Sequence, residues 1–90
     1  MRDYKKFEVW KLAHKLALQV YEVTKSFPSD ERFGIISQLR RASLSIPTNI
    51  VEGASRNSEK EFAYFISIAS GSSAEVEYLL EFSKDLKYIS

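Results

Sequence analysis

The sequence predicts an all-α protein, an up-down antiparallel bundle of three long helices in a single domain that spans residues 1–90. Apolar residues recur at steps of three and four in three successive segments, which gives each segment one apolar helical face. Only two short stretches, around Pro28 and over residues 53–58, interrupt this period. Three glycines, two prolines and no cysteine leave little room for loops and exclude a disulfide scaffold. Short turns between long helices make them antiparallel neighbours.

The first helix is expected over about residues 5–26. Lys25, in its last turn, suits the negative end of the helix dipole. Its apolar residues predict one buried face, which consists of Val9, Ala13, Leu16, Val20, Val23 and Phe27.

The second helix is expected over about residues 30–54, with Ser29 as its N-cap. Pro47 lies inside this helix, and it removes the hydrogen bond to the carbonyl of Ser43. Because the apolar pattern continues in phase past the proline, we expect one bent helix rather than two. Its expected buried face consists of Ile36, Leu39, Ser43, Ile46, Ile50 and Gly53.

The third helix is expected over about residues 59–87. Ser58 and Glu61 form a capping box, in which each side chain accepts a hydrogen bond from the other residue's backbone amide. Its face consists of Phe62, Phe65, Ala69, Ser72, Val76, Leu79, Ser83 and Leu86. In the core of the bundle we expect Leu39, Ile46, Ile50, Phe62, Phe65, Ala69, Val76 and Leu79.

The charge distribution is uneven although the net charge is only +1. Residues 1–27 carry six basic against three acidic side chains, and residues 57–90 carry three against six. These two segments can attract each other within one chain or between chains. The charged start leads into no apolar signal segment, and no apolar run approaches the roughly 18 residues of a membrane span. We therefore expect a cytoplasmic protein that does not enter a membrane.

Residues 38–53, QLRRASLSIPTNIVEG, followed by Arg56, resemble the signature of the four-helix-bundle proteins encoded in intervening sequences of bacterial 23S ribosomal RNA genes. Residues 7–10, FEVW, fit the first helix of this family, and several residues after Glu61 fit its next block: Phe62, Phe65, Ile68, Ala69, Ser70, Gly71, Ser72 and Glu75. The family is similar to the accessory protein of diversity-generating retroelements. The resemblance implies a homopentameric barrel and a role linked to RNA.

The family pattern continues into a fourth helix beyond the equivalent of residues 85–90, where this sequence stops. Either the sequence is a truncated product or fragment, or this member consists of three helices. In both cases we expect a three-helix protomer with a long groove in place of the fourth helix. A homo-oligomer would cover that groove, and the family form is a pentamer, with a dimer as the alternative.

Basic side chains are the candidates for contact with RNA or DNA, because guanidinium groups match phosphate oxygens bidentately. One candidate group lies near the centre of the chain, and a second basic strip lies on the first helix beside Trp10. The alternative is structural: Arg40 and Arg41 can pair with Glu52, Glu61 or Glu75 and fix the helix register, and Arg56 can cap carbonyls at the end of the second helix. For the strip on the first helix, the alternative is a solvated helix face beside core aromatics. The candidate residues are Arg40, Arg41, Arg56, Lys60, Lys11 and Lys15.

Apolar residues outside the expected core favour self-association, because large exposed apolar patches usually mark interfaces. The residues in excess of the core are Trp10, Ile35, Leu44, Ile68, Phe82 and Tyr88. Small residues of the third helix would let another backbone come near. The expected oligomer interface consists of Trp10, Ile68, Gly71, Ser72 and Phe82.

No catalytic site, metal site or cofactor is expected from the sequence. His14 is the single histidine, Ser70 lies in no nucleophile elbow, and Glu75 and Glu77 diverge on a helix. We therefore expect a non-enzymatic helical-bundle protein that forms homo-oligomers and binds RNA or another nucleic acid. The alternative is a structural or adaptor oligomer that holds the helix of a protein partner in a groove.

Overall fold

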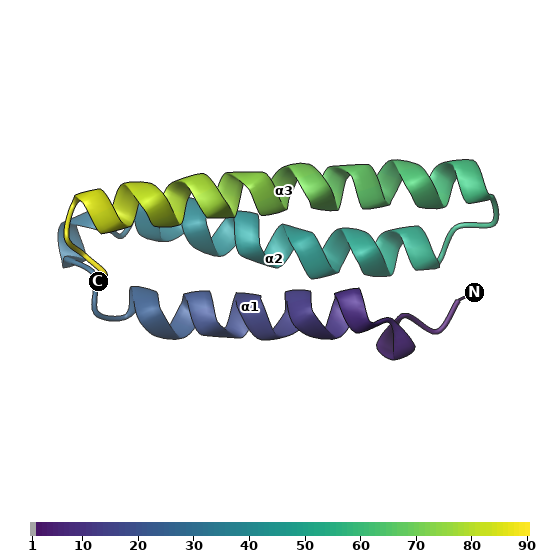
Figure 1. Cartoon of the computed structure of the whole chain (residues 1–90), viewed down its shortest axis with the longest axis horizontal. Coiled ribbons are helices and arrows are strands. Elements are labelled where there is room, and N and C mark those ends of the chain that lie inside the picture. The colour runs from purple at the N-terminus through teal and green to yellow at the C-terminus, as the bar shows by residue number, and fades with distance from the viewer. Residues whose placement is uncertain (1) are drawn as a thin grey trace.

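The computed structural model describes residues 2–90, which form three α-helices and no strand. The helices are α1 (Glu8–Thr24), α2 (Ile35–Ala54) and α3 (Glu59–Asp85), with two short 3₁₀ helices, η1 (Tyr4–Lys6) and η2 (Ser29–Glu31). They lie side by side in an elongated bundle with extents of 43 × 20 × 19 Å (Figure 1). The predicted all-α bundle of three long helices is confirmed. Among residues 2–90, no helix combines the length and the apolar character that a membrane span requires.

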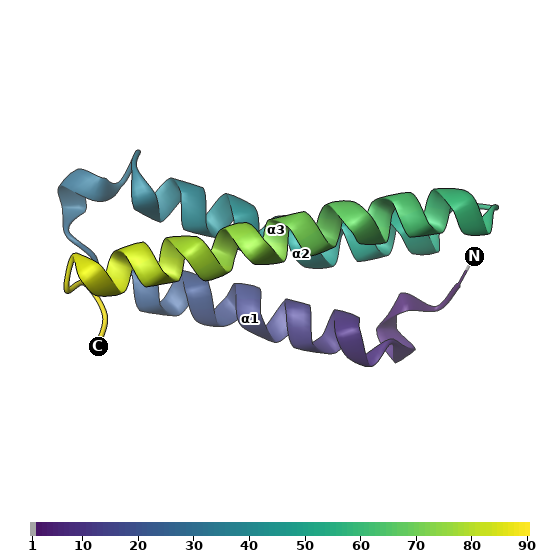
Figure 2. The ribbon, with the colours of Figure 1, turned by 45° about the horizontal axis from the view of Figure 1, so that its top comes forward.

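The central element of the bundle is α2. Both α1 and α3 pack antiparallel to it, whereas no Cα atom of α1 comes within 8 Å of a Cα atom of α3. Figure 2 shows the separate paths of α1 and α3 over much of their length. The bundle therefore closes around α2 and stays open between α1 and α3.

Pro47 lies within α2, which is one continuous helix as predicted. The Pro47 side chain is buried, and the axis of α2 changes direction along its length in Figure 2. Proline has no N–H to donate to the carbonyl four residues earlier, so a bend is the expected consequence.

The predicted start of the second helix is wrong. Ser29 begins η2, and α2 starts only at Ile35. Gly34 separates the two helices because its backbone angles, φ −106° and ψ −118°, are not helical. At the start of α3, Ser58 accepts a hydrogen bond from the Glu61 amide at 3.1 Å, as predicted. The reciprocal bond of the capping box is not formed between these two described residues.

The predicted core is correct for six of its eight residues, all of which are buried: Leu39, Ile46, Ile50, Ala69, Val76 and Leu79. Phe62 and Phe65 are only half-buried, so this part of the prediction is wrong. Their rings lie at the end of the bundle, where two arginine side chains cover them instead of a further helix.

The buried face of α1 also differs from the prediction. Val9 is 56% exposed and Val23 is exposed as well, because the backbone of α1 lies close to that of α2 but not to that of α3, so that α1 buries a narrow stripe. Small residues let the two helices approach closely along that stripe. Its buried residues are Ala13, Ala17, Val20 and Thr24, and Phe27 continues it beyond the helix.

The end of α3 is closed by the residues that follow it. Lys87 has a positive φ of 64°, and Tyr88 donates its amide to the Ser83 carbonyl at 2.9 Å, as in a Schellman cap. The tail then folds back on the bundle, with the Tyr88 ring 5.2 Å from that of Phe27. Leu86, expected on the buried face, is exposed because it lies at this cap.

Candidate nucleic-acid interface

The six predicted basic residues do not form one patch. Arg40 and Arg41 lie in the first half of α2, whereas Arg56 and Lys60 flank the turn between α2 and α3. Lys11 and Lys15 lie on α1. The contacts of each side chain therefore decide which of them can bind a ligand.

Arg40 holds α1 and α2 together. Its Nε donates to the Thr24 hydroxyl at 2.9 Å, and its Nη2 donates to the Tyr21 carbonyl at 3.2 Å. The guanidinium also lies over the Tyr21 ring, 4.8 Å from its centre. Thr24 is buried, so these bonds fix one register between the two helices. The structural interpretation is correct for Arg40, although its partners lie on α1 and are not glutamates.

Arg56 is engaged at the opposite end of α2. It pairs with Glu52 at 3.3 Å and lies over the Phe65 ring, 4.8 Å from its centre. Arg2 plays the same role beside it, since it forms an ion pair with Glu59 and lies 4.4 Å from the centre of the Phe62 ring. We call this group the arginine-capped end, and its residues are Arg2, Glu52, Arg56, Glu59, Phe62 and Phe65.

Arg2 was missed by sequence reasoning. Its amide donates to the Ala54 carbonyl at 3.1 Å, and its guanidinium donates to the Arg56 carbonyl at 3.0 Å. These bonds tie the first residues of the chain to the end of α2. No periodic pattern marks such a contact, because residues 2–7 precede the first α-helix.

The three lysines are more exposed. Lys11 pairs with Glu8 at 3.1 Å on the surface of α1. The side chains of Lys15 and Lys60 form no hydrogen bond or ion pair with any residue of 2–90. The Trp10 ring beside this strip stacks on His14, with ring centres 4.9 Å apart and planes 9° from parallel. This face of Trp10 is therefore already occupied within the chain.

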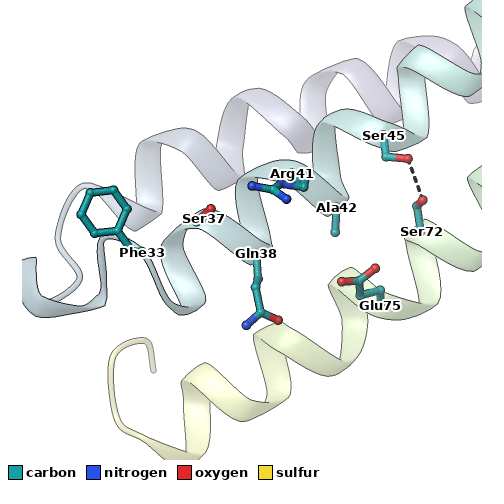
Figure 3. Close-up of a pocket in the computed structure, with 8 residues that line it drawn as sticks. All are labelled: Phe33, Ser37, Gln38, Arg41, Ala42, Ser45, Ser72 and Glu75. Carbon is teal, nitrogen blue, oxygen red and sulfur yellow. Dashed lines mark hydrogen bonds between the residues drawn. The ribbon is translucent and has the colours of Figure 1, made fainter.

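Arg41 faces a pocket between α2 and α3 with a volume of about 460 Å³ (Figure 3). We call it the polar pocket, and its lining residues are Phe33, Ser37, Gln38, Arg41, Ala42, Ser45, Ser72 and Glu75. Within residues 2–90, the guanidinium of Arg41, the amide of Gln38 and the carboxylate of Glu75 make no side-chain hydrogen bond. The pocket thus combines a cation, an anion and an amide that have no partner in the described chain.

Two serines hold the walls of the polar pocket together. The hydroxyls of Ser45 on α2 and Ser72 on α3 hydrogen-bond to each other at 2.8 Å, the contact drawn in Figure 3. Asn49 donates to the Ser45 hydroxyl at 3.0 Å and to its carbonyl at 2.8 Å. Ser72, expected at an oligomer interface, therefore takes part in a contact within the chain.

The other predicted interface residues lie on two separate elements. Ile68, Gly71 and Phe82 lie along α3, where Phe82 is 45% exposed and a side chain at Gly71 would meet no atom within 4 Å. Trp10 lies on α1 and contacts Tyr4 as well as His14. These residues do not form one continuous surface.

A second hollow lies in the opening between α1 and α3, with a volume of about 480 Å³. We call it the apolar groove, and it is lined by Val9, Ile46, Ile50, Ile66, Ala69, Ser70, Ser73, Ala74 and Glu77. Leu12, one turn after Val9 on α1, is 67% exposed. The sequence signal for this surface was present in Val9 and Leu12, whose spacing marks a second apolar stripe beside the buried one.

One titratable group has a shifted pKa, and it lies away from both hollows. The Tyr88 hydroxyl donates to a Glu31 carboxylate oxygen at 2.8 Å, and this bond raises the pKa of Tyr88. Among residues 2–90, no three His, Cys, Asp or Glu side chains gather in a way that could hold a metal ion.

Comparison with known protein families identifies the family of this chain. The family model described as 23S rRNA-intervening sequence protein matches residues 5–90, which is nearly the whole chain. No curated protein matches the sequence.

Proposed function

Because the chain belongs to the 23S rRNA-intervening sequence protein family, we propose that it is a non-enzymatic, self-associating protein of the cytoplasm that binds RNA through basic side chains. The observation that carries RNA binding is the state of Arg41. Its guanidinium lines an open pocket without an internal partner, unlike those of Arg40 and Arg56. A guanidinium in that state can bind a phosphate bidentately.

Lys60 and Lys15 add to this electrostatic surface, because neither is paired within the described chain. Arg40, Arg56 and Lys11 are occupied by contacts inside the protomer, so we assign RNA contact to the other three candidates. The expected binding is electrostatic and weakens steeply with salt.

Self-association is supported by the apolar surface that the three helices leave uncovered. Leu12 and Leu18 on α1 and Tyr64 and Phe82 on α3 are all exposed. The apolar groove adds the exposed Val9 and the half-buried Ile66 to this surface. Burial of apolar area contributes about 25 cal/mol per Å². The resemblance implies a pentamer, and light scattering at micromolar concentration tests it, since a stable monomer of native helicity contradicts self-association.

The test of RNA binding uses a fluorescein-labelled single-stranded RNA of 20 nucleotides, with anisotropy measured at several salt concentrations. We expect the double variant Arg41→Ala, Lys60→Ala to bind more weakly and to lower the salt slope, by about 0.7 for each lost phosphate contact. The matched control is Lys25→Ala with Lys84→Ala, which removes the same charge elsewhere. Equal affinity of the two double variants, both with native circular dichroism, contradicts this assignment.

The apolar groove favours a second candidate function, in which it holds an apolar helix of a partner protein. Its floor of Ile46 and Ile50 and its wall of Ile66 and Ala69 fit the apolar face of such a helix. Binding of this kind changes little with salt, whereas phosphate binding does not survive high salt. A pull-down from lysate at two salt concentrations separates the two functions.

A further inference from the structure

The polar pocket carries an inference that rests on the proposed RNA binding and makes it specific. We propose that this pocket takes up one unstacked guanine base of a single-stranded RNA. Phe33 provides the surface on which the base stacks, Arg41 binds the adjoining phosphate, and Glu75 accepts hydrogen bonds from the base edge.

The size and position of the pocket suit a single nucleotide. Its volume of about 460 Å³ falls within the range of about 300–1,000 Å³ that small-molecule sites occupy. Its walls belong to α2 and α3, and the Ser45–Ser72 hydrogen bond ties them together. The site therefore exists before the ligand arrives, which lowers the cost of ordering it on binding.

The Phe33 ring is the most exposed large apolar side chain of the described residues, at 90%. It precedes α2 at the edge of the pocket, and the Arg32 guanidinium lies 5.6 Å from its ring centre. An exposed aromatic ring beside cations is the arrangement that stacks bases of single-stranded nucleic acids. The ring is not part of the core, so its face is open to a stacking base.

The charged groups of the pocket are kept apart. Figure 3 shows Arg41 extending along α2 toward Ser37 and Phe33, while Glu75 projects from α3 beside Ala42. They form no ion pair with each other. One cation and one anion separated across a pocket match a nucleotide, which carries a phosphate at one end and N–H donors at the other.

The carboxylate of Glu75 selects the base. An ionised carboxylate only accepts hydrogen bonds, so it needs N–H donors on the base edge. Guanine presents two neighbouring donors on its Watson–Crick edge, N1–H and the N2 amino group. Adenine and cytosine each present one amino group beside an acceptor nitrogen, and uracil presents one N–H between two carbonyls. Two parallel bonds to one carboxylate therefore favour guanine.

Four RNA octamers test the base preference, each with seven uridines and one central guanosine, adenosine, cytidine or inosine. Anisotropy titrations of the full chain at low salt measure each Kd. We expect the guanosine octamer to bind about tenfold more tightly than the adenosine octamer, by analogy with other bidentate base contacts. Inosine lacks the N2 amino group and should fall between them.

Two variants locate the preference in the pocket. Glu75→Ala should abolish the difference between guanosine and adenosine, whereas Glu81→Ala, an exposed glutamate on the same helix that lines a different hollow, should preserve it. Phe33→Ala should weaken all four octamers. A preference that persists in Glu75→Ala, or equal affinity of wild type for the four octamers, overturns the inference. If the four octamers bind equally and Arg41→Ala still weakens their binding, the proposed RNA binding stands and only the guanine preference is overturned. If no octamer binds, the guanine preference and the proposed RNA binding are both overturned.

Discussion

The arginine-capped end and the polar pocket are built from the same kinds of side chain but use them differently. At the arginine-capped end, Arg2 and Arg56 lie over two phenylalanine rings, at 4.4 and 4.8 Å, and each forms an ion pair. In the polar pocket, Arg41 and Glu75 form no ion pair within the described residues, and the Phe33 ring is 90% exposed, with the Arg32 guanidinium 5.6 Å from its centre. An arginine beside aromatics and glutamates is therefore structural or available according to its neighbours, which its sequence context does not reveal.

Helix phase explains how close neighbours in the sequence reach opposite states. Successive residues of an α-helix point about 100° apart, so Arg40 and Arg41 face different neighbours. Arg40 faces α1 and binds Thr24 and Tyr21, whereas Arg41 faces the pocket beside α3. The helix that each arginine faces therefore decides whether its guanidinium has a partner within the described residues.

The largest expected effect is a difference in the free energy of unfolding between two phenylalanine variants, one in each region. Phe65→Ala should lower the free energy of unfolding by about 2–3 kcal/mol, less than for a fully buried ring, because Phe65 is half-buried beneath Arg56. Phe33→Ala should change it by less than about 0.5 kcal/mol, because that ring is 90% exposed and its contact with the Arg32 guanidinium lies at the surface. Urea denaturation measures both. A similar loss for the two variants would show that the regions do not differ as described.

The next largest effects on stability are expected for alanine substitutions of two glycines. A Cβ on Gly53 would lie 3.0 Å from the Phe65 Cβ and 3.3 Å from the Phe62 carbonyl oxygen. Gly53→Ala should therefore cost about 1–3 kcal/mol through overpacking. Gly71→Ala meets no atom within 4 Å and should stabilise α3 by about 0.5–1 kcal/mol. Thermal unfolding followed by circular dichroism checks the opposite signs, and two changes of the same sign would refute the close approach at Gly53.

The two adjacent arginines give a smaller but more direct contrast. Arg40→Ala removes two hydrogen bonds between α1 and α2 and should cost about 1–2 kcal/mol. Arg41→Ala should change stability by less than about 0.5 kcal/mol, because its guanidinium has no partner among residues 2–90. Urea denaturation of the two variants should therefore give well-separated midpoints. Equal midpoints would mean that the contacts of Arg40 with α1 contribute nothing.

The sequence predicted the elements of this fold well because long runs of apolar residues at helical spacing identify helices whatever packs on them. The sequence prediction failed where a neighbouring helix or residue decides whether a side chain is buried or where a helix starts. Val9 and Val23 were expected inside because the pattern cannot tell that α1 lies close to α2 but not to α3. Ser29 resembled an N-cap, but the backbone angles of Gly34 delay the helix to Ile35.

The sequence predicted a candidate site made of basic residues, but it named Arg41 alone among the residues that line the polar pocket as a candidate for nucleic-acid contact. The Arg41 and Lys60 side chains have no hydrogen-bond or ion-pair partner among the described residues, while Arg40 and Arg56 belong to internal contacts; contact of Arg41 and Lys60 with nucleic acid stays a prediction. Phe33, Gln38 and the pocket role of Glu75 were not predicted. Phe33 and Gln38 lie five residues apart around the start of α2, whereas Glu75 is far from them in the sequence, and the pairing of α2 with α3 brings it beside them.

The smallest expected effect concerns a third kind of contact, the bond from the Tyr88 hydroxyl to Glu31, which joins the tail to η2. Because the bond to Glu31 raises the pKa of Tyr88 above its ordinary value of about 10, the neutral phenol stabilises the fold. This stabilisation is present below the unfolded pKa and is lost as the pH rises through the folded pKa. Tyr88→Phe should therefore be slightly less stable than wild type at pH 8, and the difference should shrink above pH of about 10. Urea midpoints at the two pH values measure it, with the exposed Tyr78→Phe as the control that removes another phenol. A difference between wild type and Tyr88→Phe that stays constant with pH would show that the bond to Glu31 does not hold the tail in place.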